Sequence, residues 1–279
     1  MRSTLRRHAA FTNVPTGGNP AGVWIGDALP APQEMQRIAA EVGYSETAFL
    51  APTRGFARTV RYYSPEQEIE FCGHATIASG VVLGETEGAG TYRFAIKPGE
   101  IPVRVQQRDG RWEAALTSVA PRHEPAPAKL VAGALAALGW NAADLDPAIP
   151  PARAFAGVWH LVLAVRGLER LVKLAYDYER LKALMHADGL TTLQLIWRER
   201  MDLFHSRNPF PVGGVVEDPA TGAAAAALGG YLRDAGLSAA PATIVIRQGE
   251  AMGRPSRITV EIPAAGGIVV SGNAAPMDV

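Results

Sequence analysis

The sequence predicts an α+β fold built from two similar lobes. Many short strand-like segments and few helices favour this class over a doubly wound parallel sheet. A strand–turn–helix start also occurs twice, once at FCGHAT (Phe71–Thr76) and once at EDPATG (Glu217–Gly222). At a constant offset the copies agree at Ala75 and Ala220, Thr76 and Thr221, Ala78 and Ala223, Leu83 and Leu228, and Gly84 and Gly229. The repeat predicts two lobes whose helix starts direct free N–H groups, which favour anions, at one cleft.

The composition is that of a globular protein with one large or two medium domains. The chain has 279 residues, of which 48% are hydrophobic, and its 27 basic and 27 acidic residues balance. This balance argues against nucleic acid or an anionic membrane as a partner. No apolar run approaches the roughly 20 residues of a spanning helix, and no secretory signal is visible. We expect a soluble cytoplasmic protein, and its single cysteine excludes an intrachain disulfide.

The N-terminal lobe is expected to cover residues 1–120. Apolar residues at helical spacing predict a helix over Pro32–Val42. A second, short helix is expected near Ala75–Leu83 and should end at Gly84, because glycine commonly follows the last helical residue. Period-two patterning predicts strands at Thr59–Ser64 and Ile101–Gln106.

The C-terminal lobe is expected over residues 128–264, and residues 265–279 could complete the first lobe. A segment rich in proline and alanine, Val119–Lys129, is the best linker candidate. Helices are expected near Lys129–Leu138, Tyr178–Met185 and Ala220–Arg233. Strands are expected near Leu161–Val165, Leu193–Trp197, Asp202–Ser206, Pro211–Val216, Thr243–Arg247, Arg257–Ile262 and Gly267–Ser271. The alanine-rich last helix should be buried, since small side chains let a sheet approach closely.

Glu46, in the segment GYSETAFL, is the main candidate for a general acid or base. If this segment is a strand, Glu46 shares a face with Ala48 and Leu50. An apolar face disfavours the charged carboxylate, which should raise the pKa of Glu46 toward the value that acid–base catalysis needs. In the alternative, Glu46 faces solvent and Thr47 and Phe49 belong to the core. The pattern alone favours neither arrangement.

The first turn carries His74 and Cys72. A lone histidine is commonly structural, but beside a helix start an imidazole tends to stay neutral and could donate a hydrogen bond or shuttle a proton. A thiolate near a helix start is activated. Two-thiol racemases, however, need a cysteine on each side of the substrate, and the residue aligned with Cys72 is Glu217. We therefore exclude that mechanism and expect Cys72 to be a small buried residue.

The second turn and a glycine-rich segment offer further binding candidates. Asp218 precedes Pro219 and could serve as the N-cap of a proline-initiated helix, or its carboxylate could orient a substrate amine or hydroxyl. Asn19, in TGGNPAG, belongs either to a plain turn or to a loop that lines the cleft. The six histidines are scattered without HExxH or CxxC spacing, so no metal site is expected.

Five segments occur in an order that resembles the phenazine-biosynthesis PhzF-like family: GNPAGV, SETAF, FCGHAT, EDPATG and QGEAMGRPS. The resemblance covers nearly the whole chain. It implies a fold similar to diaminopimelate epimerase, with two pseudo-symmetric lobes, each a mostly antiparallel sheet around a central helix. The active site would lie between the lobes. The resemblance also implies a homodimer that needs no metal or organic cofactor.

The resemblance assigns roles to particular residues. The family's general acid/base matches Glu46, and its best-known member shifts a proton within 2,3-dihydro-3-hydroxyanthranilate. His74 and Asp218 match residues that help to bind and polarise the substrate. Two positions depart from the pattern: Ala223 replaces a common serine, and Ala9 replaces an acidic residue two positions before a phenylalanine. The missing serine hydroxyl leaves the substrate open.

The leading hypothesis is a cofactor-independent isomerase or epimerase that moves a proton on a small carboxylate-bearing metabolite through Glu46. The expected substrate-binding residues are Asn19, Gly73, His74, Asp218, Thr221, Gly222 and Ala223. One alternative, motivated by Ala223, is a metabolite-binding protein without catalysis. Another is a dehydratase or racemase that uses the same glutamate.

Overall fold

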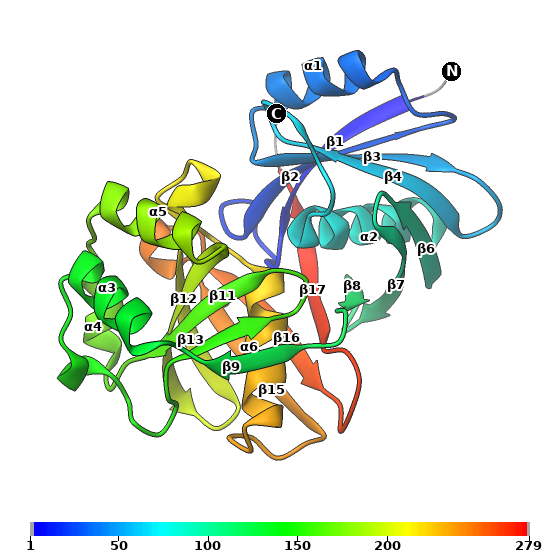
Figure 1. Cartoon of the computed structure of the whole chain (residues 1–279). Helices are drawn as coiled ribbons and strands as arrows, with labels where there is room; N and C mark the ends of the chain where they lie inside the picture. Colours follow the sequence, from blue (N-terminus) through cyan, green and yellow to red (C-terminus); the bar gives the residue numbers. More distant parts are fainter. Residues whose placement is uncertain (1–2, 278–279) are drawn as a thin grey trace. The chain divides into compact units, whose positions relative to one another are not determined.

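Strands outnumber helices in both of the units into which the chain divides (Figure 1). The computed structural model describes residues 3–277. One unit comprises Met1–Thr117 and Ser271–Val279, and the other comprises Ser118–Val270. The mixed α+β class expected from the sequence is thereby confirmed. Among the helices of the described residues, none is long and apolar enough to cross a membrane.

The strands of the first unit pair in a closed circuit. In order around this circuit they are β1 (Ser3–Ala10), β2 (Asn19–Gly26), β3 (Glu46–Pro52), β4 (Ala57–Tyr63), β6 (Gly90–Ile96), β7 (Gly99–Arg108), β8 (Arg111–Thr117) and β17 (Val269–Pro276), which returns to β1. The short β5 (Glu68–Ile69) pairs with the end of β4. Parallel pairs need a crossover. Helices α1 (Pro32–Val42) and α2 (Gly73–Glu87) lie in the connections of the parallel pairs β2–β3 and β4–β6.

Helix α2 is buried along nearly its whole length. Every residue from His74 to Gly84 is buried, and the helix packs against β1, β2, β3, β7 and β8. Two of its glycines make this contact possible. A Cβ at Gly80 would lie 2.6 Å from the Ala114 Cβ, and one at Gly84 would lie 2.5 Å from the Trp112 ring. The strands therefore approach the helix more closely than larger side chains would permit.

The predicted bounds of this helix were wrong at both ends. It begins at Gly73 rather than Ala75, and it continues through Gly84 to Glu87 before ending at Gly88. Gly84 is a packing residue inside the helix and not its C-terminal glycine. Sequence alone could not separate these two uses of glycine, because only the position of Trp112 on β8 distinguishes them.

The second unit has its own central helix and an outer helical layer. Its strands are β9 (Arg122–Pro125), β10 (Ala152–Phe155), β11 (Trp159–Ala164), β12 (Leu190–Arg200), β13 (Leu203–Pro209), β14 (Glu217–Asp218), β15 (Ala242–Gln248) and β16 (Ser256–Ile262). Its helices are α3 (Ala128–Leu138), α4 (Leu168–Val172), α5 (Tyr178–Ala187) and α6 (Gly222–Asp234), with 3₁₀ turns at Ala142–Asp144, Pro211–Gly213 and Glu250–Met252. Helix α6 packs against β9, β10, β11 and β16, and residues Ala224–Leu232 are buried, as expected for the alanine-rich segment. Helices α3, α4 and α5 contribute to a separate apolar core with β11 and β12.

Two predicted segments of this unit were wrong. Val119–Lys129 is not a plain linker, because Arg122–Pro125 pairs with β10 as strand β9. Pro211–Val216 is not a strand: a 3₁₀ turn covers Pro211–Gly213, and Gly214 adopts a left-handed conformation (φ 79°). The proline at the start of this turn and the glycine after it interrupt an extended chain.

Both units contain the same order of connections around the central helix. Strand β4, two-residue strand β5, helix α2 and parallel strand β6 correspond to β13, β14, α6 and β15. When the two helices are aligned at their first residues, Gly73 corresponds to Gly222. The sequence match of Ala75 with Ala220 is shifted from this alignment by about one helical turn. The alignment of Cys72 with Glu217 was therefore wrong, and Cys72 corresponds to Thr221. The exclusion of two-thiol chemistry still holds, because the chain has one cysteine.

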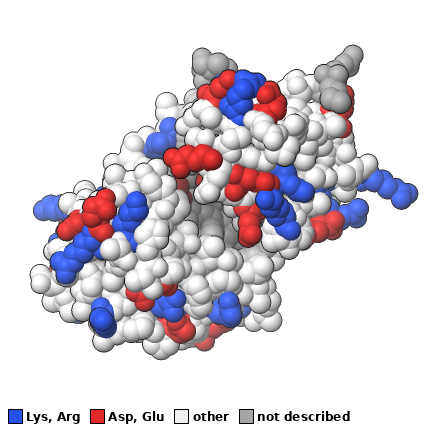
Figure 2. Space-filling model, turned by 45° about the horizontal axis from the view of Figure 1, so that its top comes forward, with Lys and Arg blue, Asp and Glu red and all other residues white. Residues whose placement is uncertain are grey.

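Basic and acidic side chains are interspersed on the face seen in Figure 2. The ion triad of Arg37 with Glu34 and Glu41 on α1 is an example of this mixing. A face with this mixture of charges does not provide the single-sign field that nucleic acid binding uses.

The close packing of α2 predicts unequal responses to two glycine substitutions in the same helix. Gly84→Ala should lower the free energy of unfolding by about 1–3 kcal/mol, because the new methyl group overlaps the Trp112 ring. Gly73→Ala is the matched control. A Cβ there would meet nothing within 4 Å, so its free energy of unfolding should stay unchanged or rise by up to about 1 kcal/mol. Urea unfolding measures both, and equal destabilisation would contradict the packing described for Gly84.

Candidate active site

Glu46 and His74 form an ion pair where strand β3 and helix α2 begin. Glu46 is the first residue of β3 and His74 the second residue of α2, and Glu46 Oε2 lies 3.2 Å from His74 Nε2. The side chain of Glu46 is 18% exposed and that of His74 is 9% exposed. Thr47 and Phe49, on the other face of β3, are fully buried as well. The carboxylate is therefore held against the helix start and does not face solvent, whereas the part of the alternative that places Thr47 and Phe49 in the core is confirmed.

The ionisation of this pair differs from the sequence expectation. Burial opposes the charge on Glu46, but the interactions with His74, together with smaller ones with Ser45 and Cys72, outweigh burial and hold the pKa of Glu46 below its usual range. Burial also opposes protonation of His74, yet its contacts with Cys72 and with the carboxylate of Glu46 raise the pKa of His74 well above its usual range. Glu46 was predicted to have a raised pKa and His74 to be neutral. Both predictions were wrong, because each group supplies the other's counter-charge.

Further polar groups surround the imidazole. Asn19, the first residue of β2, is 2% exposed, and its Nδ2 lies 3.2 Å from His74 Nδ1. Ser45 Oγ lies 3.5 Å from His74 Nε2. Asn19 was expected either in a plain turn or on a ligand-lining loop. Its contact with the ring places it in this cluster, together with Ser45, which sequence analysis did not single out.

Cys72 lies beside His74 but is not an activated nucleophile. Burial, followed by the nearby charge of Glu46, raises the pKa of the Cys72 thiol to about 11, so the group is a thiol at neutral pH. Its Sγ lies 3.3 Å from His74 Nδ1 and 3.7 Å from Nε2. If the sulfur lay in the plane of the ring, along the lone-pair direction of one nitrogen, it would be much farther from the other nitrogen. The two similar distances therefore show that the sulfur is not in line with either nitrogen. The expectation of a small buried residue is confirmed.

The same side chains are also of types that bind metals. One potential ligand atom from each of Glu46, Cys72 and His74 lies within 4.8 Å of the others. This grouping was not visible in the sequence, because the three residues have no metal-binding spacing. An ion bound by one ring nitrogen lies outside the ring and would hold the sulfur farther from the other nitrogen. Because Cys72 Sγ lies 3.3 and 3.7 Å from the two nitrogens, the side chains would have to rearrange to hold one ion.

Gly73 leaves open space at the start of α2. It is half-buried, and a Cβ built on it would meet no atom within 4 Å. Its backbone does not require glycine, since its φ lies outside the left-handed region. An alanine would also suit a helix better. Neither strain nor packing within the described residues therefore accounts for the glycine, and close approach of a ligand to the backbone is a use that fits it.

The second turn has a different local design from the one expected. Asp218 lies in β14, and Thr221, not Asp218, is the N-cap residue of α6. Thr221 Oγ1 donates a hydrogen bond of 2.5 Å to Asp218 Oδ2. Asp218 is therefore not the helix cap, and Pro219 is not the first helical residue. Gly222 and Ala223 follow as the first two residues of α6 and are half-buried.

Gln248, at the end of β15, holds the second turn. Its side chain is 2% exposed. Its Nε2 donates to the backbone oxygen of Asp218 (2.7 Å) and to Thr221 Oγ1 (3.0 Å), and its Oε1 accepts from Thr221 N (3.2 Å). Ser256 Oγ donates to the Pro219 oxygen (3.0 Å). In the sequence both residues stand out only as part of QGEAMGRPS, because a buried glutamine cannot be recognised from its spacing alone.

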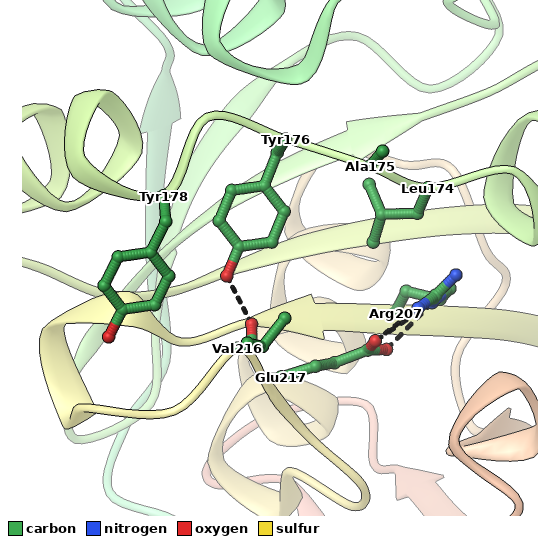
Figure 3. A pocket seen from close by; sticks show the side chains of 7 residues that line it. All are labelled: Leu174, Ala175, Tyr176, Tyr178, Arg207, Val216 and Glu217. Carbon is green, nitrogen blue, oxygen red and sulfur yellow. Dashed lines mark hydrogen bonds and ion pairs between the residues drawn. The ribbon is translucent and has the colours of Figure 1, made fainter.

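A pocket of about 280 Å³ adjoins β14 (Figure 3). Glu217 lines it and accepts hydrogen bonds from the guanidinium of Arg207, and Tyr176 donates to the Val216 oxygen. Neighbouring residues of a strand point to opposite faces, so Glu217 and Asp218 are directed to different sides of β14. The pocket is lined by Leu174, Ala175, Tyr176, Tyr178, Arg207, Val216 and Glu217, and contains none of the predicted site residues.

The predicted site residues thus fall into two groups. The first unit brings together Glu46, Asn19, Gly73 and His74 around the start of α2. The second unit brings together Asp218, Thr221, Gly222 and Ala223 around the start of α6. One group carries an acid–base pair, and the other carries a carboxylate held by a hydroxyl and has alanine at the position that corresponds to His74.

Comparison with known proteins identifies relatives along nearly the whole chain. A family model described as phenazine biosynthesis-like protein, PhzC-PhzF, matches residues 8–278. The Bacillus subtilis protein named uncharacterized isomerase YfhB is 32% identical over 276 residues, covering 94% of this chain and 92% of its own. The trans-2,3-dihydro-3-hydroxyanthranilate isomerase of Pseudomonas fluorescens is 30% identical over 251 residues, covering 88% of this chain and 86% of its own.

The fold has a close match as well. A crystal structure of a Bacillus anthracis phenazine biosynthesis protein of the PhzF family superposes with a TM-score of 0.86 at 24% identity, covering 100% of this chain and 98% of the other. The resemblance noted in the sequence is confirmed by the family model and the relatives. The chain belongs to the phenazine biosynthesis-like PhzC-PhzF family.

Proposed function

We propose that this protein is a cofactor-independent isomerase that shifts a proton between two positions of a small carboxylate-bearing metabolite, with Glu46 as the general base and then the general acid. Relatives named isomerases over nearly the whole chain support the reaction class. The observation that carries the mechanism is the buried Glu46–His74 pair beside the open space at Gly73. A homodimer forms part of the same proposal.

The proton and electron balance of the reaction is simple. The carboxylate of Glu46 takes a proton from a carbon whose electron pair delocalises into a neighbouring unsaturated or carboxyl group. The protonated Glu46 then returns the proton to a second carbon, so that the product is an isomer. His74, whose Nε2 lies on the side of Glu46, stabilises the negative charge that develops by donating a hydrogen bond. A carboxylate with a lowered pKa is a weak base, so the substrate C–H bond must itself be activated.

The second turn is proposed to supply further substrate contacts through Asp218, Thr221, Gly222 and Ala223. Ala223 corresponds to His74 in the repeated connection and has no group that can exchange a proton. A racemase needs proton transfer on both faces of one carbon, most readily from two groups. A single acid–base group instead favours removal and return on one face of the substrate. The alanine therefore favours isomerisation over racemisation.

Proton exchange with solvent tests the role of Glu46. The wild type and Glu46→Gln are incubated in D₂O with trans-2,3-dihydro-3-hydroxyanthranilate and with each protein amino acid, and NMR follows deuterium incorporation and isomer formation. At least one compound should react with the wild type, and Glu46→Gln should reduce its rate by about 10²-fold or more. Equal rates for the two proteins would contradict the role of Glu46. Ligand-induced thermal stabilisation without exchange or turnover would favour a binding protein.

The open space at Gly73 gives a second prediction. Gly73→Ala should lower the rate of deuterium incorporation into the compound that reacts with the wild type by at least about 10-fold, because its methyl group occupies space that the ligand needs. Its free energy of unfolding should not fall, so the loss cannot come from misfolding. Gly133→Ala on α3 is a control outside the candidate site. An unchanged exchange rate in Gly73→Ala would show that no ligand lies against this glycine.

The ion pair predicts a pH-dependent coupling. Stability from the raised pKa of His74 is present below its ordinary value of 6.5 and is lost as the pH rises through the folded-state pKa. Stability from the lowered pKa of Glu46 is present above its ordinary value of 4.5 and is lost in acid. A double-mutant cycle of Glu46→Gln and His74→Gln should therefore give a coupling of roughly 1–3 kcal/mol at pH 6 that declines toward pH 10.

The exposed pair of Glu34 and Arg37 on α1 is a suitable control for this cycle, since its N···O distance is 2.6 Å but its side chains are 45% and 55% exposed. Its coupling should be small and equal at both pH values, because solvent screens it. A Glu46–His74 coupling that does not change between pH 6 and pH 10 would contradict the ionisation described here.

A further inference from the structure

We infer that Gln248 is a positioning residue, which acts through the Thr221 hydroxyl to fix the orientation of the Asp218 carboxylate. The inference concerns hydrogen bonds within the second unit and holds for the resting protein. Its consequence for catalysis rests on the proposed function, in which Asp218 contacts the substrate.

The three hydrogen bonds of Gln248 determine which way its amide faces. Thr221 N can only donate, so it meets the amide oxygen of Gln248. The amide nitrogen is thereby directed toward two acceptors, the backbone oxygen of Asp218 and Thr221 Oγ1. A buried amide is costly unless it is hydrogen-bonded, and at 2% exposure these bonds satisfy both ends of the Gln248 amide.

The direction of the next hydrogen bond follows from this arrangement. Thr221 Oγ1 accepts from Gln248, so the single hydrogen of its hydroxyl is available to donate to Asp218 Oδ2, 2.5 Å away. A rotating hydroxyl could otherwise point elsewhere. Gln248 thus sets the direction of two consecutive hydrogen bonds: its amide nitrogen donates to Thr221 Oγ1, and Thr221 Oγ1 donates to one oxygen of the Asp218 carboxylate. A hydrogen bond to the charged form stabilises the carboxylate and limits its rotation.

Gly249 and Ser256 fix the backbone around these hydrogen bonds. Gly249 adopts a left-handed φ of 76°, and a Cβ there would lie 2.3 Å from the Arg254 oxygen and 2.7 Å from the Pro219 oxygen. Only glycine lets β15 end this close to the turn. Ser256 also donates to the Pro219 oxygen but has no hydrogen bond to Thr221 or to the Asp218 carboxylate among the described contacts. Ser256 therefore holds the backbone alone and provides a matched control.

The test compares Thr221→Val, which removes the hydroxyl at nearly constant volume, with Ser256→Ala, Thr221→Ser and Gln248→Met. ¹³C NMR of protein labelled at the aspartate carboxyls, assigned with Asp218→Asn, gives the pKa of Asp218 in each variant. Thermal unfolding of each variant is measured in parallel. Thr221→Val and Gln248→Met should raise that pKa by about one unit, since the hydrogen bond to the charged carboxylate is lost or disordered. Thr221→Ser should restore it, and Ser256→Ala should leave it unchanged although it loses a hydrogen bond to the same turn.

Proton exchange on the compound identified for the wild type gives the functional readout. We expect a loss of about 10-fold in Thr221→Val and Gln248→Met, a smaller loss in Thr221→Ser, and the wild-type rate in Ser256→Ala. Equal pKa values of Asp218 in Thr221→Val and Ser256→Ala, or no restoration by Thr221→Ser, would overturn the inference. If Asp218→Asn keeps the wild-type exchange rate, the proposed role of Asp218 in substrate binding fails, whereas the NMR comparison still decides the role of Gln248.

Discussion

The near-complete burial of helix α2 is the constraint on which the first unit depends. Strands pair in a closed circuit around it, so the long faces of the helix are unavailable to a ligand. Gly80 and Gly84 let the strands close at this distance, because any larger side chain would meet β7 or β8. Only the ends of such a helix remain for chemistry, and its N-terminus is the end that favours an anion. Glu46 and His74 lie at this end.

The same constraint accounts for the unusual ionisation at the helix start. Charged groups are costly to bury, and removal of one partner from a buried pair leaves the other uncompensated. Glu46 and His74 avoid this cost by pairing, with Asn19 and Ser45 at hydrogen-bonding distance from the ring. The pair lies beside Gly73, where a side chain would meet no neighbouring atom within 4 Å. In the second unit, Thr221 and Gln248 provide the comparable support for Asp218.

The sequence alone was sufficient to predict features that depend on residues close together along the chain. The helical spacing of Pro32–Val42 predicted α1 with its bounds, and the alanine-rich segment predicted a buried helix. It was insufficient where a distant residue decides the outcome. Gly84 looks like the end of a helix in the sequence, and only its contact with Trp112 shows that it is a packing residue. Glu46 was expected to have a raised pKa because the sequence does not show that His74 lies 3.2 Å from it. Gln248 has no local signature, because its three hydrogen-bond partners lie 27 and 30 residues earlier.

The central claim is that one shielded carboxyl group carries a proton from one carbon to another on the same face of the substrate. The most direct measurement uses the compound that exchanges, deuterated at the carbon that loses its proton, in a single turnover in H₂O. The account predicts that part of the deuterium is found at the new position in the product, because Glu46 returns some of it before exchange with solvent. Product that carries only solvent hydrogen at that position, at every turnover time, would contradict the claim.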